Sequence, residues 1–419
     1  MEHNPALALF LALGIVITSA RIAGGLARQF RQPRVLGELI VGVILGPTLL
    51  DLLHSSALGL DQAHVSETVS ELAQLGVLLL MFKIGLDVHI AELMKVGKVA
   101  LFAGLGGALL PVIMVYPIVR LTGIGWEAAL FTGVILAATS VSISAQVLLE
   151  LDVLQTKEGN ALLAAALIDD VVAILLVSIT VAITSPREGG LDAGVLLGIV
   201  GRMALYFVGA FMIAWFLIPR LINWMQTQPA IAHSYGIPAI ALVLALLFGW
   251  SAEAWGGVAA ISGAFIVGAG LSRAREPIKH TIDVAISNIA YTLLIPIFFV
   301  NVGLEIDLHL LPLSVLPLAA LLLVLAFASK LIGCGAGALL GGFNRQESLR
   351  LGICMVSRGE VGLIIASLGA SSGVFRSDDG LYGAVFLVIL LSTVITPPLV
   401  RRVFQNHPVQ KRGAAHAQS

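Results

Sequence analysis

Long apolar runs alternate with short polar stretches along almost the whole chain. Thirteen of the runs are of helical length, and the polar stretches between them leave no room for a soluble domain. The runs cover residues 6–26, 35–53, 68–86, 99–119, 127–149, 161–184, 194–218, 234–252, 256–271, 284–303, 312–340, 347–370 and 381–400. Because about 20 apolar residues span a bilayer as a helix, the pattern predicts an all-α polytopic membrane protein with 13 transmembrane helices.

The runs resemble one another in pairs. Gly85-Leu-Asp-Val-His89 ends the third run much as Gly303-Leu-Glu-Ile-Asp307 ends the tenth, and Ile40-Val-Gly42 resembles Ile266-Val-Gly268. In both pairs the partner lies seven crossings further on, so the two copies would face opposite ways across the membrane. This is the arrangement of the inverted repeats in many secondary transporters.

The repeat divides a single transmembrane domain, residues 1–405, into three parts. We expect repeat one at about 6–184, a linker helix at about 194–218 and repeat two at about 234–400. The polar tail 406–419 is expected to be cytoplasmic and disordered.

Two runs at equivalent places in the predicted repeats are interrupted by small polar residues. The fifth contains Ala137-Ala-Thr-Ser-Val-Ser-Ile-Ser-Ala145, and the twelfth contains Met355-Val-Ser-Arg-Gly-Glu-Val-Gly-Leu363. Unpaired backbone at membrane depth is tolerated only where it is buried in protein or lines a cavity. We therefore predict two discontinuous helices that cross beside Asp169 and Asp170.

Composition supports the membrane assignment. Charged residues make up 12% of the chain and the mean hydropathy is +0.99, whereas soluble domains contain about 25% charged residues. The formal net charge of −1 argues against a nucleic-acid partner. Cys334 and Cys354 both lie in apolar runs, which suits core packing rather than a disulfide or a metal site.

The basic residues of the loops predict the orientation. One set of loops carries only Arg120, Arg187 and Arg376, whereas the other set, with the tail, carries sixteen basic residues. Cytoplasmic loops are enriched in Lys and Arg, so we expect the amino terminus outside and the carboxyl terminus in the cytoplasm of a cell membrane.

Ionisable residues inside the apolar runs are the candidates for chemistry. They are Asp169, Asp170, Lys330, Arg358 and Glu360. A charge costs roughly 2.5 to 3.5 kcal/mol at the centre of a membrane helix, so each of these residues needs a reason. Oxygen ligands suit hard cations, and a carboxylate can hold a cation or a proton at the same place. Competition between the two is itself a mechanism of exchange.

The two aspartates are expected to have different partners, because adjacent helix residues point about 100° apart. One can face a cation pathway while the other meets a buried cation such as Lys330. If a metal cation displaces Lys330 from its aspartate, the lysine can release its proton and the cycle moves charge. The alternative is a static salt bridge that only neutralises the pair.

The other buried charges have structural interpretations beside functional ones. Arg358 and Glu360 flank Gly359 at the second interruption, where a structural clamp on unwound backbone is favoured over a role as ion ligands. Lys83 lies near the end of the third run, where a lysine usually extends its charge to the membrane surface.

Five motifs in order resemble the monovalent cation/proton antiporters of the NapA type, which are related to the membrane domains of the Kef systems. The motifs are Gln32-Pro-Arg-Val-Leu-Gly-Glu38, Ala138-Thr-Ser-Val141, Ile168-Asp-Asp-Val171, Ser329-Lys-Leu-Ile-Gly333 and Arg358-Gly-Glu-Val-Gly-Leu363. The chain departs from that family at Lys83, where an apolar residue is usual, and at Asp87, where Glu is usual.

The resemblance implies an NhaA-like antiporter fold, a homodimer, and a six-helix core that moves as an elevator against a fixed dimerisation domain. It implies that Asp170 is the principal carrier of the cation and the proton, and that Asp169 is the second carboxylate, paired with Lys330. Thr139 and Ser140 would be the unwound backbone beside them. The Asp-Asp pair and Lys330 resemble the electrogenic branch of the family.

The sequence therefore predicts a transporter and not an enzyme: an electrogenic Na⁺/H⁺ antiporter in the lipid bilayer, with Na⁺ and H⁺ as transported partners and no cofactor. Transport of Li⁺ or K⁺, electroneutral exchange, and a non-transporting sensor on the same fold are the alternatives. An intramembrane aspartyl protease also needs two carboxylates, but they must share one site, and neighbours on one helix diverge.

Overall fold

The computed structural model describes residues 5–54, 63–184, 193–225, 235–305, 307, 313–371, 373–375 and 380–405. Within these ranges every regular element is helical, and nine helical segments are long and apolar enough to cross a membrane. The helices of the first half are α1 (Pro5–Gln29), α2 (Arg34–Leu45), α3 (Ala63–Asp87), α4 (Ile90–Lys95), α5 (Gly97–Leu121), α6 (Trp126–Ile135), α7 (Val141–Glu150), α8 (Lys157–Thr184), α9 (Ala193–Met212) and α10 (Ile218–Met225). Those of the second half are α12 (Gly236–Ser251), α13 (Ala260–Leu271), α14 (Glu276–Ile289), α15 (Ile295–Leu304), α16 (Leu316–Leu340), α17 (Arg345–Cys354), α18 (Glu360–Ser371) and α19 (Leu381–Phe404).

Both predicted interruptions separate two helices. The fifth run forms α6 and α7 with a break at 136–140, and the twelfth forms α17 and α18 with a break at 355–359. An Asn344 capping box begins α17, with the Asn344 side chain accepting hydrogen bonds from the backbone N–H groups of Gln346 and Glu347. Broken helices therefore occupy the places where small polar residues interrupt the apolar pattern.

Some predicted boundaries were wrong. The second run was expected to be helical to residue 53, but α2 ends at Leu45, because Gly46 adopts an extended conformation before Pro47. A short 3₁₀ turn, Leu52–His54, follows. The tenth run begins earlier than expected, at Glu276, and contains the π-helical turn Ala290–Leu294 between α14 and α15.

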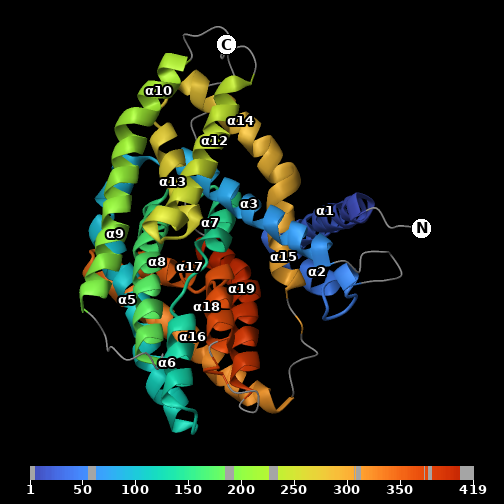
Figure 1. Cartoon of the computed structure of the whole chain (residues 1–419), viewed down its shortest axis with the longest axis vertical. Helices are drawn as coiled ribbons and strands as arrows, with labels where there is room; N and C mark the ends of the chain where they lie inside the picture. The colour runs from blue at the N-terminus through green and yellow to red at the C-terminus, as the bar shows by residue number, and fades with distance from the viewer. Residues whose placement is uncertain are drawn as a thin grey trace.

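The helices form two groups. We call α5, α6, α7, α8, α16, α17, α18 and α19 the core bundle, because each packs against others of this set. The scaffold bundle consists of α1, α2, α3, α12, α13, α14 and α15. It also includes α9 and α10, which pack against α13. In Figure 1 the core helices α6, α16, α18 and α19 lie in the lower half, and α12, α13 and α14 lie in the upper half.

Contacts between the bundles are sparse compared with those inside each bundle. The helices α2 and α3 contact α7, α2 contacts α19, and α8 contacts α9. The two bundles thus meet along a seam that α7, α8 and α19 line on the core side.

Glycines bring the central core helices together. A Cβ atom at Gly106 of α5 would lie 2.4 Å from the carbonyl oxygen of Gly333 of α16, and one at Gly333 would lie 2.3 Å from the carbonyl oxygen of Gly106. Real Cβ atoms do not approach backbone so closely, so only glycine fits at either position. The backbones of α5 and α16 are therefore in close contact at this point.

Candidate functional site

The two helix breaks cross and hold each other through hydrogen bonds. The backbone N–H of Ser140 donates to the carbonyl of Ser357 at 2.9 Å, and the Ser357 hydroxyl donates to the carbonyl of Ser140 at 2.6 Å. The Ser144 hydroxyl donates to the carbonyl of Cys354 at 2.6 Å. A Cβ atom at Gly359 would lie 2.8 Å from the Ser140 side chain, so this crossing requires a glycine.

Arg358 links the two breaks through hydrogen bonds to their backbone carbonyls. Its guanidinium is fully buried; Nε and Nη2 donate to the carbonyl of Leu136 at 3.1 and 2.6 Å, and Nη2 also donates to the carbonyl of Ala326 on α16 at 3.1 Å. Nη1 donates to the carbonyl of Val356. The arginine therefore binds carbonyls of both breaks, as a structural clamp would. The side chain of Glu360, the second residue of the expected clamp, lies outside the described residues.

Asp169 and Lys330 form a buried ion pair. Lys330 Nζ lies 2.9 Å from Asp169 Oδ1, and the two side chains are 0% and 1% exposed. Gly107 of α5 lies against the pair, since a Cβ atom there would be 3.6 Å from Lys330 Nζ and 3.7 Å from Asp169 Oδ1. The pair thus joins α8 to α16 at the place where glycines bring α5 close.

Asp170 has a partner in the scaffold bundle, whereas the partner of Asp169 lies on α16. The Ser262 hydroxyl on α13 donates to Asp170 Oδ2 at 3.3 Å, and both residues are buried. The two aspartates therefore have separate partners, as their spacing on the helix requires. Sequence reasoning missed Ser262, although its hydroxyl is the one polar side chain in the apolar stretch 258–271.

Two buried oxygens near the pair and the first break have no hydrogen-bond partner within the described part of the chain. They are Oδ2 of Asp169 and Oγ1 of Thr139. Buried polar atoms are normally hydrogen-bonded, so such atoms mark places that suit a proton or a cation with oxygen ligands. Ser140, the neighbour of Thr139, is occupied in the crossing of the breaks.

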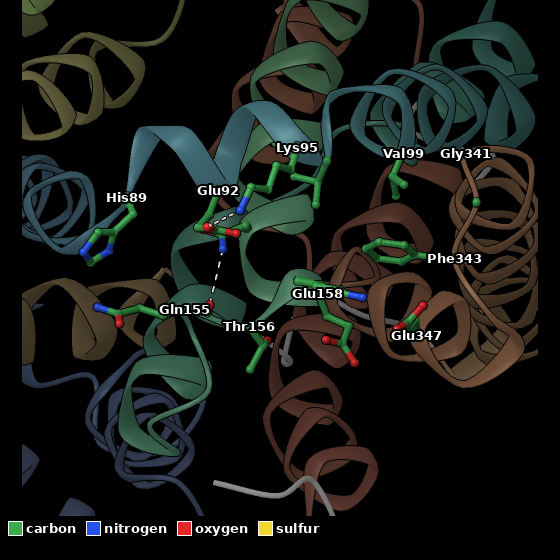
Figure 2. A pocket seen from close by; sticks show the side chains of 14 residues that line it. His89, Glu92, Lys95, Val99, Gln155, Thr156, Glu158, Gly341, Phe343 and Glu347 are labelled. Carbon is green, nitrogen blue, oxygen red and sulfur yellow. Dashed lines mark hydrogen bonds and ion pairs between the residues drawn. The ribbon is translucent and has the colours of Figure 1, made fainter. Parts of the chain in front are cut away.

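A large cavity with a mixed polar and apolar lining opens elsewhere, beside the start of α8. It has a volume of about 830 Å³ and lies where α4, the start of α8 and the connection from α16 to α17 meet. Figure 2 shows His89 and Gln155 at one end of it and Phe343 and Glu347 at the other. Its lining includes neither aspartate of the pair. The cavity lies near the loops that carry most of the basic residues, including Lys95 and Lys157.

The expectation that Lys83 extends its charge to the membrane surface was wrong. The side chain is buried, and Nζ lies 2.7 Å from Asp87 Oδ2 and 2.7 Å from Asp283 Oδ1 on α14. The two carboxylates compensate the buried ammonium, as a buried charge requires. The Gln155 side chain donates to the carbonyl of Asp87 at 3.1 Å, which links this cluster to the loop after α7.

The transmembrane family of sodium/hydrogen exchangers matches residues 15–405. The chain belongs to the sodium/hydrogen exchanger family. This exchanger is therefore a membrane transporter and not an enzyme.

Curated relatives match this exchanger over nearly its whole length. It is 34% identical to the Na(+)/H(+)-K(+) antiporter GerN of Bacillus cereus, over 94% of this chain and 96% of the relative. It is also 34% identical to a Na(+)/H(+) antiporter of Enterococcus hirae, over 93% of this chain and 96% of the relative.

The fold of the exchanger is that of a solved antiporter. The sodium proton antiporter MjNhaP1 from Methanocaldococcus jannaschii superposes with a TM-score of 0.66 over 96% of this chain and 99% of the other, at 15% identity. The all-helical, polytopic antiporter fold expected from the sequence is confirmed at this level.

Proposed function

We propose that this exchanger carries out electrogenic Na⁺/H⁺ antiport, with protons and Na⁺ competing for Asp170 and Asp169. The observation that carries the proposal is the pair of adjacent, buried aspartates with separate partners: Lys330 for Asp169, and Ser262 of the other bundle for Asp170. Family membership and relatives named as Na⁺/H⁺ antiporters support the exchange of a monovalent cation for protons.

Each residue of the site has its own role in the proposed exchange. Asp170 is the principal carrier, because it lies at the seam between the bundles. Na⁺ binding at the pair withdraws Asp169 from Lys330, and the ammonium then releases its proton. Thr139, whose hydroxyl has no partner in the described part of the chain, supplies an oxygen at the break together with the backbone at Ser140. Arg358 holds both breaks in shape through its hydrogen bonds to the carbonyls of Leu136 and Val356.

We propose that the cation crosses the membrane by an elevator movement of the core bundle against the scaffold bundle. The sparse seam between two separately packed bundles supports it. In each half of the core bundle, a broken helix lies between two long ones, as α6 and α7 lie between α5 and α8. That order supports an inverted repeat. The proposal also includes thirteen crossings, from the apolar runs, and an outer amino terminus with a cytoplasmic carboxyl terminus, from the basic residues of the loops. A homodimer through the scaffold is part of the same proposal.

K⁺/H⁺ exchange is the second candidate, because the relative GerN is named a Na(+)/H(+)-K(+) antiporter. An electroneutral cycle is the alternative to the electrogenic one. Both keep the same site and differ in the charge moved and the cation selected.

The test is exchange in proteoliposomes with Na⁺, Li⁺ or K⁺ under an imposed membrane potential. Na⁺ should collapse a pH gradient, and the initial rate should respond to voltage. Asp170→Asn should abolish exchange, whereas Asp152→Asn, a change at an exposed residue of the loop before α8, should leave it intact. Retained exchange in Asp170→Asn would refute the assignment of the carrier, and a rate independent of voltage would refute electrogenicity. Ion binding without any flux would favour a sensor.

A further inference from the structure

Ser262 is a rigid part of the scaffold bundle. It lies in the first turn of α13, is 2% exposed, and follows Gly257, whose φ of +66° turns the chain after the helix α12 and its π-helical end. The next residue fixes α13 against α12, because a Cβ atom at Gly263 would lie 2.1 Å from the carbonyl oxygen of Phe248. The hydroxyl of Ser262 is thus held in place by the backbone packing of two scaffold helices.

Asp170, which accepts the hydrogen bond of Ser262, belongs to the core bundle. Its helix α8 packs against α5, α6, α7 and α17. A contact between a core side chain and a scaffold side chain exists only while the two bundles hold this relative position. A contact made in one conformation and absent in another shifts the equilibrium between them by its own free energy.

We infer that Ser262 is a positioning residue that selects this arrangement of the two bundles by holding the carboxylate of Asp170. The inference rests on the proposed function, in which the core bundle moves against the scaffold. The donor to acceptor distance of 3.3 Å is long for a hydroxyl and a carboxylate. A contact of this length can break during a transport cycle without a large energetic cost.

A merely structural serine and a positioning serine predict different kinetics. A lost structural contact lowers the amount of active protein and affects both faces of the membrane alike. The loss of a contact specific to one conformation changes the fraction of protein open to one face relative to the other. Because apparent affinity scales with that fraction, the ratio of the Na⁺ KM values on the two faces must change.

The experiment measures Na⁺/H⁺ exchange by the full-length protein in right-side-out and everted membrane vesicles. In Ser262→Ala the ratio of the two KM values should change about fivefold, the effect of one net hydrogen bond. Ser262→Thr keeps the hydroxyl and should restore the ratio. The matched control is Ser272→Ala at the other end of α13, where the hydroxyl donates to the carbonyl of Ala269 at 2.7 Å; it should leave the ratio unchanged.

Two outcomes would overturn the inference. One is a ratio in Ser262→Ala equal to that of the unaltered protein, while Asp170→Asn abolishes exchange; this leaves the proposed function standing. The other is absence of exchange in the unaltered protein, which removes the proposed function as well. If Ser262→Thr does not assemble in the membrane, the comparison of Ser262→Ala with Ser272→Ala in the two kinds of vesicle decides on its own.

Discussion

Removing the charge of Lys330 should destabilise the protein far more than removing the whole ion pair does. The perturbation is Lys330→Gln, which leaves the carboxylate of Asp169 buried at 1% exposure with Oδ2 already without a hydrogen-bond partner in the described residues. Asp169→Asn removes the other charge, and the double variant Asp169→Asn/Lys330→Gln removes both.

The magnitude follows from the separation of the charges. At the observed 2.9 Å, two unit charges attract each other by about 6 kcal/mol if the effective dielectric constant is about 20. Desolvation of the two groups costs several kcal/mol each and offsets this attraction. The net value of the pair is therefore small, whereas leaving one charge unpaired costs about 3 to 5 kcal/mol.

The assay is thermal unfolding in detergent, followed by intrinsic fluorescence for the unaltered protein, the two single variants and the double variant. Each single variant should unfold at a clearly lower temperature, and the double variant should recover most of the loss. Strictly additive losses would show that the two side chains do not interact and would refute the reasoning. If the Lys330→Gln protein is stable enough to assay, its rate of exchange should still differ from that of the unaltered protein.

Three further outcomes follow from particular contacts. Gly333→Ala should lower stability by about 1 to 3 kcal/mol through overpacking, whereas Gly335→Ala, where the nearest atom to a new Cβ lies at 3.7 Å, should be tolerated; comparison of their melting temperatures decides. Lys83→Met leaves two carboxylates without their buried ammonium and should reduce the melting temperature, whereas Lys95→Met at an exposed position should not. Arg358→Lys cannot reach the carbonyls of both breaks and should give a poorly folded protein on size-exclusion chromatography. A monodisperse Arg358→Lys variant with unchanged stability would contradict the clamp.

Much of the architecture follows from local pattern. Apolar run length sets where helices can span a bilayer, because unpaired backbone cannot face lipid. The small polar residues around Ser140 and Ser357 predict the two breaks for the same reason. Adjacent aspartates on one helix must diverge, so separate partners for Asp169 and Asp170 were predictable before any partner was known.

Helix boundaries and contacts between distant segments were harder to predict from the sequence. The early end of α2 at Leu45 depends on the conformation of Gly46 and Pro47, which apolarity does not report. The π-helical turn within the tenth run depends on packing between helices. Lys83 looked like a residue at the membrane surface, because its partner Asp283 lies on a helix that follows it by nearly 200 residues.

The sequence by itself determined the class of protein, the places of the broken helices and the charged residues that need a function. Those features depend on the free-energy cost of polar groups in a membrane, and this cost is set by the residues of each segment itself. The family resemblance implied the pairing of Asp169 with Lys330, and the second interruption favoured a clamp at Arg358. Only the tertiary structure decided that the Arg358 guanidinium binds carbonyls of both breaks, that Lys83 pairs with Asp283, and that Ser262 of the scaffold bundle reaches Asp170. These contacts join segments distant in the chain, and packing of the two bundles, not local pattern, brings them together.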